Sequence, residues 1–540
     1  MKISTIVLSA SLFLPLTASV PPVFADDEGH HHEELTEQQL GTVHFPVSCT
    51  DAVQTPFQRG IALLHSFWYE EAEKEFVDIA KDDPKCAMAQ WGLAMSQWHQ
   101  LWNHPDDAVT KKGKVEVKKG KSLHAKTPRE RGYIAAIYAF YAGKGDFQAR
   151  ATAYTRGMEK VYEQNPDDHE AAAFYALSLL TSNEGNDPNF TTDKKAAAIL
   201  EKLFAIEPDH PGVAHYLIHA YDKPQLAQLG LPAARRYAQI APASPHALHM
   251  PSHIFARVGM WQEDINSNLA SVAATRKSAA MHMGGGGHQF HAMDFLFYAY
   301  LQSGRDADAR ALVEEVKAMP SSHDMYGLGF DPHAAALVHF TALYPLEMRH
   351  WADAAALTPT AIAGKEEDCD IYWARAIGAA HLGNAGQVKD DAAHLDEIHK
   401  QLVAEKKKEF AEGVEDQHKE ALAWLSVAEG KYDDALAVLR PMADKEDSLG
   451  EEPQGIPTRE MVAEVLLMAK RPELALAEYE TDLKFNPNRF NGLYGAAQAA
   501  EAAGKQDKAA QYYAELVKVC AGSNSDRPEL SKAKGLVAQK

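Results

Sequence analysis

The 540-residue chain lacks the short motifs that identify the commonest metal-dependent and nucleophilic enzymes. No HExxH or CxxC metal-binding motif is present, and no GxSxG motif presents a serine nucleophile. Its run of four glycines, residues 284–287, lacks the lysine–hydroxyl ending of the GxxxxGKS/T motif, which argues against a nucleotide site. No catalytic residue is therefore predicted, and the sequence leaves open whether the protein is an enzyme.

Long apolar runs are absent after the first 25 residues. Those residues are typical of an export signal: Lys2 is basic, Ile3–Val20 is mostly apolar, and Val23–Ala25 fits a cleavage site. A single-pass anchor is the alternative, but the run is short and interrupted by proline. The sequence therefore predicts a signal peptide at residues 1–25. It also predicts a periplasmic or secreted protein that is not an integral membrane protein after cleavage.

Cysteine is scarce, with four residues in the whole chain, but export makes a disulfide bond possible. Cys49 lies just before the first expected helical hairpin, and Cys86 starts the helix after it, about one repeat period later. Stacked repeats bring two such places together, so we predict a Cys49–Cys86 disulfide. Cys369 and Cys520 are far apart in sequence, and no pairing is assigned to them.

Basic residues are in deficit, because 54 Lys and Arg face 75 Asp and Glu, for a formal net charge of −21. An acidic surface of that size argues against nucleic acid and anionic membranes as partners. It is compatible with cations or basic partners, and it equally fits an acidity that simply keeps the protein soluble.

The segment that follows the signal peptide, residues 26–54, begins with DDEGHHHEE, which contains no apolar residue. We expect this acidic, histidine-bearing segment to be partly disordered. The three histidines at 30–32 either capture a metal ion loosely or belong to a solvated tail.

Stretches with the two-residue period of a β-strand are missing as well, whereas helical periodicity starts at Thr55. Gly60, Ala72, Phe76 and Pro84 are separated by 12, 4 and 8 residues, the intervals between signature positions of the tetratricopeptide repeat. Small residues let two helices approach closely, the aromatic residue fills the gap to the next repeat, and the proline ends the second helix.

Later matches keep the same phase. The five-residue interval from a turn glycine to a packing alanine recurs at Gly304/Ala309, Gly430/Ala435 and Gly504/Ala509. The chain resembles exported bacterial tetratricopeptide-repeat proteins over residues 55–521, which leaves a C-terminal tail at 522–540. The resemblance implies an all-α solenoid of helical hairpins, forming a right-handed superhelix with a concave groove. We expect the lysine-rich insert Lys111–Lys126 to be an exposed loop or helix end.

Histidines concentrate in the middle of this pattern, around residues 245–261. In the tetratricopeptide family, positions 2, 5, 9, 12 and 13 of the first helix face the groove. We take Gly259 and Gly304 as position 15 of their repeats and Pro208 as position 32 of its own. This register places six histidines and two aspartates on that face: His215, His219, Asp222, His246, His249, His253, His291 and Asp294.

The spacing supports the same grouping without the family. Pairs four apart, such as His215/His219 and His249/His253, share a helix face. Two imidazoles one turn apart can both reach one metal ion, and a neighbouring helix can supply further ligands. The predicted metal ligands, for zinc or copper, are His215, His219, His249, His253, His288, His291 and Asp294.

Other interpretations of these residues stay open. Histidines on a groove also stack on aromatic rings, cap helices or hydrogen-bond a bound peptide. The glycines at 284–287 either form an amide-rich turn that holds an anion or serve as a flexible connector. Pro251 lies inside one of the expected helices and could rotate or break it.

A groove for a peptide or protein partner is the principal function that we predict. The expected groove residues are His246, Tyr298, Asp222, Trp98 and Trp102, although the tryptophans equally fit a core. The alternative is a zinc- or copper-binding protein with its histidine cluster on the middle helices. That alternative extends to a metal-dependent enzyme with Asp222 or Asp294 as the base.

Overall fold

The computed structural model describes residues 35–101, 105–183, 187–320, 331–359, 368–450 and 455–539, without the side chain of residue 409. Within these ranges the regular structure is entirely helical and no strand occurs. Residues Thr36–Lys540 form one compact unit. The predicted signal peptide, the histidines at 30–32 and Trp102 lie outside the described residues.

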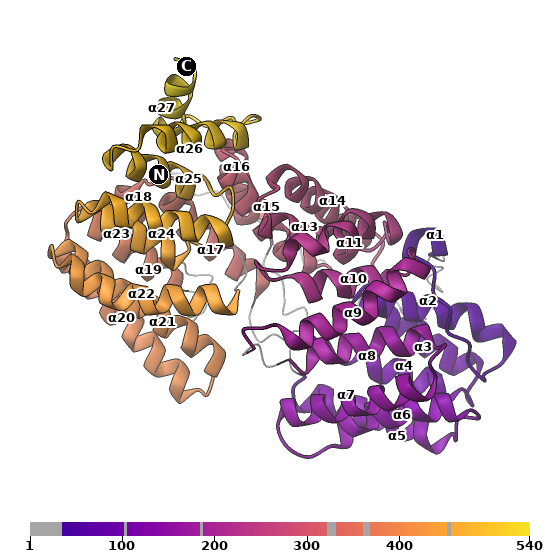
Figure 1. Ribbon diagram of the computed structural model, residues 1–540. Coiled ribbons are helices and arrows are strands. Elements are labelled where there is room, and N and C mark those ends of the chain that lie inside the picture. Colours follow the sequence, from indigo (N-terminus) through magenta and orange to yellow (C-terminus); the bar gives the residue numbers. More distant parts are fainter. Residues whose placement is uncertain are drawn as a thin grey trace, which may run out of the picture. The chain divides into compact units, whose positions relative to one another are not determined.

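The helices of the N-terminal half follow one another with short connections (Figure 1). They are α1 (Glu37–Leu40), the 3-10 helix η1 (Asp51–Val53), α2 (Gln54–His65), α3 (Tyr69–Asp82), α4 (Ala87–Ser96), α5 (Asp107–Ser122), α6 (Pro128–Ala142), α7 (Phe147–Gln164), α8 (His169–Thr181), α9 (Thr191–Ile206), α10 (Pro211–Tyr221), α11 (Ala227–Ile240), α12 (Pro245–His249) and α13 (Pro251–Arg257). From α2 to α11 each helix packs against the next, so helical hairpins stack along the chain.

The helices of the C-terminal half continue this pattern. They are α14 (Trp261–Ala280), α15 (His288–Gln302), α16 (Asp306–Ala318), α17 (Pro332–Glu347), α18 (Trp351–Ala355), α19 (Asp368–His381), α20 (Ala385–Ala404), α21 (Lys408–Ala428), α22 (Tyr432–Leu449), α23 (Thr458–Met468), α24 (Pro472–Phe485), α25 (Phe490–Ala502), α26 (Gln506–Val519) and α27 (Pro528–Val537). The predicted fold class, an all-α solenoid of tetratricopeptide-like hairpins, is confirmed.

The first repeat shows why its signature residues are needed. Phe76 of α3 is fully buried, and its ring lies against Gly60 of α2 and Gly92 of α4. A Cβ atom at Gly60 would stand 2.8 Å from the Phe76 ring, and one at Gly92 would stand 2.4 Å from it. The aromatic residue therefore joins one hairpin to the next only because both contacting helices carry glycine there.

The four turn glycines that set the repeat register also occupy turns. Gly259, Gly304, Gly430 and Gly504 each have a positive φ, between 67° and 76°, a conformation that costs other residues energy. Each follows the first helix of a hairpin, such as α15 before α16. These glycines therefore occupy turns between paired helices, as the repeat pattern predicts.

The lysine-rich insert is largely exposed, as predicted, but most of it is helix and not a loop. Most of Lys111–Lys126 belongs to α5, whose Gly113, Val117 and Gly120 are buried. The two glycines, which disfavour a helix by propensity, lie against Tyr141 and the backbone of α4. Close packing therefore overrides the local preference, while the lysines of α5 lie on its other faces.

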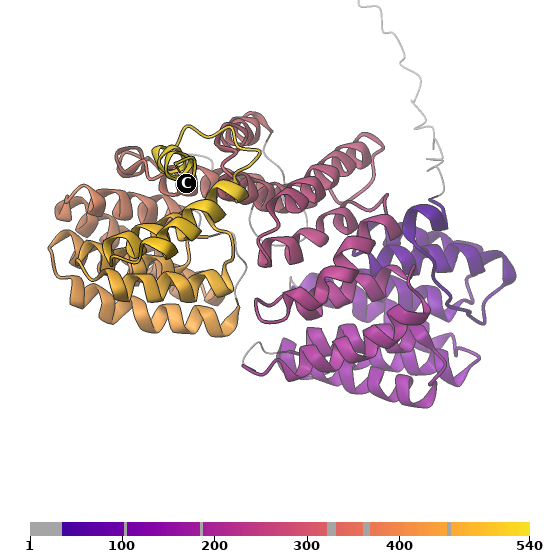
Figure 2. The same ribbon diagram turned by 45° about the horizontal axis from the view of Figure 1, so that its top comes forward.

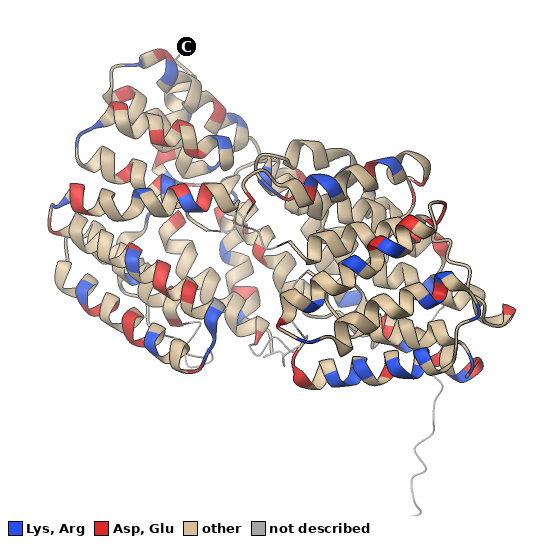
Figure 3. Cartoon of the chain, turned by 60° about the horizontal axis from the view of Figure 1, so that its bottom comes forward, with Lys and Arg blue, Asp and Glu red and all other residues tan. Residues whose placement is uncertain are grey.

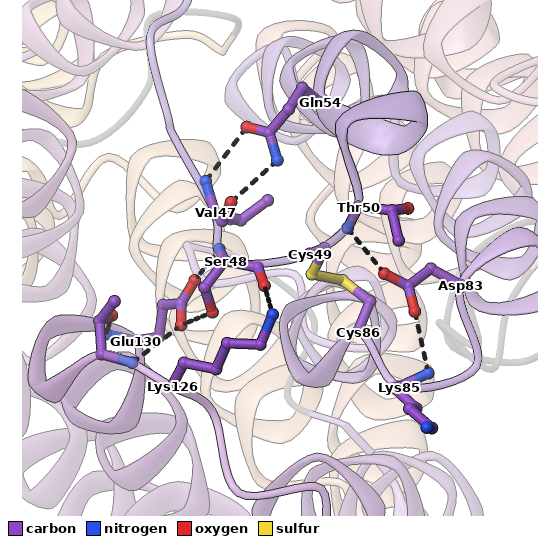
Figure 4. The surroundings of a disulfide bond; sticks show 11 residues. Val47, Ser48, Cys49, Thr50, Gln54, Asp83, Lys85, Cys86, Lys126 and Glu130 are labelled. Atoms are coloured by element: carbon purple, nitrogen blue, oxygen red, sulfur yellow. Dashed lines mark hydrogen bonds between the residues drawn. A yellow bond between two sulfur atoms is a disulfide. The ribbon is translucent and has the colours of Figure 1, made fainter.

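The predicted Cys49–Cys86 disulfide is present, with the two Cα atoms 5.0 Å apart (Figure 4). Cys49 precedes α2 and Cys86 precedes α4, the two places that the stacking of repeats brings together. Asp83 holds the same junction, because its carboxylate accepts hydrogen bonds from the amides of Thr50 at 2.8 Å and Lys85 at 3.1 Å. Cys369 and Cys520 are both buried and are not bonded to each other.

The structured unit extends beyond the predicted boundaries at both ends. Phe45, ahead of Thr55, is fully buried and contacts the rings of Phe57, Trp91 and Tyr133. Within the predicted C-terminal tail, α27 buries Leu530 and Ala533. Both segments lack the repeat spacing, so their apolar anchors were not recognised in the sequence.

Buried arginines tie the last helices to the middle of the chain. Arg489, before α25, pairs with Glu347 of α17 at 2.8 Å and with Glu460 of α23 at 3.0 Å. Arg527, before α27, pairs with Asp306 of α16 at 2.7 Å. These ion pairs join segments far apart in sequence, and the removal of one partner would leave a buried charge.

The outer faces of the helices carry acidic and basic side chains that are interspersed (Figure 3). In the described part of the chain, no helix combines the length and the apolar character needed to cross a membrane.

Candidate metal centre

Helices α12, α13 and α15 pack against one another, and α13 also packs against α10. These four helices, which carry the predicted histidines, belong to the magenta middle part of the ribbon (Figures 1 and 2). Ser244 caps α12 and Pro245 starts it. Pro251, which has no amide hydrogen, separates α12 from α13 at Met250. Because Met250 keeps helical dihedral angles (φ −50°, ψ −34°), this break does not rotate the two short helices away from each other.

The first histidine triad, His215, His219 and His246, joins α10 to α12. His215 Nε2 lies 3.1 Å from His219 Nε2 and 3.1 Å from His246 Nε2. One ring nitrogen of each residue lies within 4.8 Å of those of the other two. The triad thus consists of a pair one turn apart and a third ring from a neighbouring helix, as the spacing suggested.

The second triad, His249, His253 and His291, lies across the proline break and adds α15. His249 Nε2 and His253 Nε2 are 3.0 Å apart. The ring of His291 is centred 4.6 Å from that of His249, and the three ring nitrogens lie within 4.8 Å of one another. His291 is the least buried of the three and opens the triad toward solvent.

The hydrogen bonds of the second triad determine where its protons lie. His249 Nδ1 donates to Asn268 Oδ1 at 2.7 Å, because that amide oxygen can only accept. The amide is oriented by its nitrogen, which donates to the backbone oxygen of Asp264 at 3.1 Å. His253 Nδ1 donates to the Asp222 carboxylate at 2.8 Å. Both rings therefore carry a proton on Nδ1 and direct their Nε2 atoms toward each other.

The first triad is anchored in the same way at one ring. His215 Nδ1 donates to the backbone oxygen of His65 at 2.6 Å, so His215 Nε2 carries a lone pair. Two ring nitrogens, Nε2 of His219 and Nε2 of His246, approach this one lone pair. Since one lone pair accepts one linear hydrogen bond, hydrogen bonding accounts for only one of these two contacts.

Burial keeps these imidazoles neutral. It lowers the pKa of His215, His246 and His249 well below the usual value, and the neighbouring histidines lower it further. Burial likewise lowers the pKa of His219 to about 3 and that of His288 to about 3. Neutral imidazole is the form that binds a metal ion.

A third close group, His65, Glu170 and His210, is built differently. Glu170 accepts from His65 Nε2 at 2.8 Å and from His210 Nε2 at 3.1 Å. Burial raises the pKa of Glu170, but the two histidine rings outweigh it and lower that pKa overall. His65 Nδ1 contacts the Tyr216 hydroxyl at 2.8 Å, and His210 Nδ1 accepts from the Val213 amide. Every ring nitrogen here has a protein partner, so this group is a hydrogen-bond network.

Asp222, predicted as a groove residue, orients a histidine instead. Its carboxylate accepts from His253 Nδ1 and from Arg257 Nε, each at 2.8 Å. Although burial raises the pKa of Asp222, Arg257 and His253 bring it well below its usual range. So acidic a carboxyl group is poorly suited to act as the base of a metal-dependent enzyme.

Two predicted ligands lie outside both triads. Asp294 lies 3.5 Å from Nε2 of His339. His288 contacts His246, with ring centres 4.9 Å apart, but contributes to neither group of converging nitrogens. A position on the same face of α15 as His291 therefore did not decide which side chains join a triad.

The glycine run ahead of α15 is held against α3. Trp68 Nε1 donates to the Gly284 oxygen at 2.9 Å, and the Gly284 amide donates to Glu71 at 2.7 Å. A Cβ atom at Gly284 would stand 2.6 Å from Glu70 Cβ. The Gly284 amide already donates to a carboxylate of the chain, which argues against an anion site there. The two hydrogen bonds also hold the run in place, which argues against a flexible connector.

The aromatic residues predicted to line a groove are buried. Trp98 is fully buried and stacks on Phe140, with ring centres 3.7 Å apart. Tyr298 is also buried, and its hydroxyl accepts a hydrogen bond from Arg489. Neither presents a surface to a peptide, so their assignment to a groove was wrong, and they serve the packing of the helices. His246 likewise belongs to the first triad.

Two solved structures are similar in fold at low sequence identity. The human IFIT1 dimer with m7Gppp-AAAA shares 13% identity at a TM-score of 0.34, over 90% of this chain and 98% of that chain. An IFIT1 monomeric mutant with Gppp-AAAA shares 12% identity at a TM-score of 0.33, over 89% and 98%. No protein-family model matches the chain, and no curated protein matches it. Such similarity does not indicate what this chain binds, so bacterial origin, export and the exclusion of nucleic acid stay predictions.

Proposed function

We propose that the protein binds a transition-metal ion, zinc or copper, through Nε2 of His249, Nε2 of His253 and a ring nitrogen of His291. One observation carries the proposal: Nε2 of His249 and Nε2 of His253 lie 3.0 Å apart and converge with a ring nitrogen of His291, while the Nδ1 atoms of the first two rings contact oxygen acceptors behind them. A metal ion can take these converging nitrogens as ligands at once.

The dimensions fit such an ion. With metal–nitrogen bonds of about 2.0–2.1 Å, two ligand nitrogens of a tetrahedral ion are about 3.3 Å apart. The observed 3.0 Å needs only a small outward movement of the rings. Asn268 and Asp222 then act as the outer partners that hold metal-binding histidines in one tautomer.

Three histidines leave a coordination position for water or a substrate, and His291 places that position toward solvent. All-nitrogen ligands suit zinc and copper alike. Export to the periplasm or the cell exterior stays part of the proposal, and the Cys49–Cys86 disulfide is compatible with it. A peptide-binding groove stays a prediction with less support, since Trp98 and Tyr298 are buried.

The test is metal analysis of the purified full chain, stripped with a chelator and then reloaded with Zn2+ or, without oxygen, with Cu+. We expect bound metal and a rise in Tm for the wild type, and loss of metal from the second triad in the double variant His249→Ala/His253→Ala. The matched control is His350→Ala/His399→Ala, two histidines of the C-terminal half, which should load like the wild type. Less than about 0.1 ion per chain in the wild type would reject the proposal.

A further inference from the structure

We infer that His215, His219 and His246 hold a second metal ion beside the first, so that the centre is dinuclear. This inference rests on the proposed function and extends it from one ion to two. It starts from the convergence of three ring nitrogens on one point, with His215 Nε2 at 3.1 Å from both others. His215 is oriented by the backbone oxygen of His65, as His253 is by Asp222.

The two triads are in direct contact. The rings of His219 and His253 are centred 6.3 Å apart, and those of His246 and His249 are centred 6.1 Å apart. Two bound ions, one in each triad, would therefore be neighbours. Sites so close share one electrostatic environment, and binding at one affects binding at the other.

The helices also couple the two triads mechanically. The short helix α12 contributes His246 to the first triad and His249 to the second, one turn later. Helix α10 carries His215 and His219, and Asp222, which orients His253, follows its last turn. Each of these elements therefore holds parts of both triads, and an ion in one triad stiffens the frame of the other.

The charge of the site limits which ions form the pair. The ligands of both triads are imidazoles, which bring no negative charge, and the carboxylate of Asp222, which contacts His253, already pairs with Arg257. Two divalent ions would bring four positive charges into this buried region, which is costly without added anions. Two Cu+ ions bring half that charge, so Cu+ is the first probe and Zn2+ the second.

The experiment counts copper ions in the stripped full chain after anaerobic loading with Cu+. We expect about two ions per wild-type chain, and about one in His219→Gln, in His246→Gln and in His249→Ala/His253→Ala. His219 is only half-buried, so we expect His219→Gln to keep the fold even where His246→Gln does not. Circular dichroism checks the fold of both variants. One ion per wild-type chain, lost only with His249 and His253, overturns the dinuclear inference and leaves the proposed function intact. No ion at all overturns both.

A second readout tests proximity. After loading with Cu2+, the wild type should give an electron paramagnetic resonance signal broadened by, or reduced through, coupling between two ions. His219→Gln should instead give the sharp signal of one isolated ion, with the full intensity of its bound copper. Two full-intensity isolated signals in the wild type would show independent sites and would overturn the dinuclear centre.

Discussion

Two groups of histidines in this molecule bring their ring nitrogens or carboxylate oxygens within 4.8 Å of one another, but their hydrogen bonds differ. In the His65–Glu170–His210 group, a carboxylate lies between the rings and accepts a hydrogen bond from each. In the His249–His253–His291 group, oxygen acceptors lie behind two of the rings and direct their Nε2 atoms toward each other. The density of histidines does not distinguish a network from a metal site. The position of the acceptor relative to the rings does.

The largest effect should come from breaking the network. Glu170→Ala removes a buried carboxylate and leaves two imidazole donors unsatisfied, so we expect a loss of about 3–5 kcal/mol in unfolding free energy. Urea denaturation of the metal-stripped protein measures it. The control Glu207→Ala breaks the half-exposed pair with His169 and should cost below about 1 kcal/mol. Equal losses in both variants would contradict the structural role given to Glu170.

The opposite result is expected for the second triad. His249→Ala/His253→Ala should remove the stabilisation that the metal ion in the second triad gives, about 2.7 kcal/mol at a metal concentration of 100 times Kd. The difference in Tm with and without Zn2+ is the measurement. An unchanged difference would place the metal elsewhere.

The residues that hydrogen-bond the histidines from outside the triad provide the next test. Asp222→Asn replaces the carboxylate behind His253 and should lower metal affinity by about 10–100-fold. Competition with a chromophoric chelator gives the affinity. The exposed Asp209→Asn, which loses only a surface pair with Arg236, is the control and should bind like the wild type. Equal affinities for both variants would show that orientation of His253 does not matter.

A pH-dependent effect is expected for Glu420, a buried glutamate of the C-terminal half. Burial raises the pKa of Glu420 to about 8, while hydrogen bonds from Trp373 and Thr458 lower it only in part. Because the folded-state pKa is raised, the stability from protonated Glu420 is fully present below pH 4.5 and is lost as pH rises through 8. Glu420→Gln should abolish this loss, about 1.4 kcal/mol per pH unit at most.

Unfolding free energies at pH 5, 6, 7 and 8 check this prediction, with the half-exposed Glu415→Gln as the control. The expected contrast is with Glu170, whose pKa is lowered, so that its contribution is lost only as pH falls below about 4.5. A pH profile that is identical in Glu420→Gln and wild type would mean that Glu420 is ionised in the folded protein.

Much of the fold could be predicted because helical repeats are local. Gly60, Ala72 and Phe76 lie within one hairpin, and their spacing alone indicates which helices touch. The same local logic located the Cys49–Cys86 disulfide. It failed at α5, whose lysine-rich sequence was taken for a loop or helix end although Gly113 lies against Tyr141, and at Tyr298, whose hydroxyl contacts Arg489 far along the chain.

The sequence by itself determined the helical solenoid and the pairs of histidines one turn apart, because a helix places residues i and i+4 on one face wherever it lies. The tertiary structure decided which histidine ring nitrogens lie close together. His249 depends on Asn268, 19 residues away, His253 on Asp222, 31 residues away, and His215 on the backbone of His65, 150 residues away. No periodicity encodes these partners, since each comes from another helix whose orientation is set by packing.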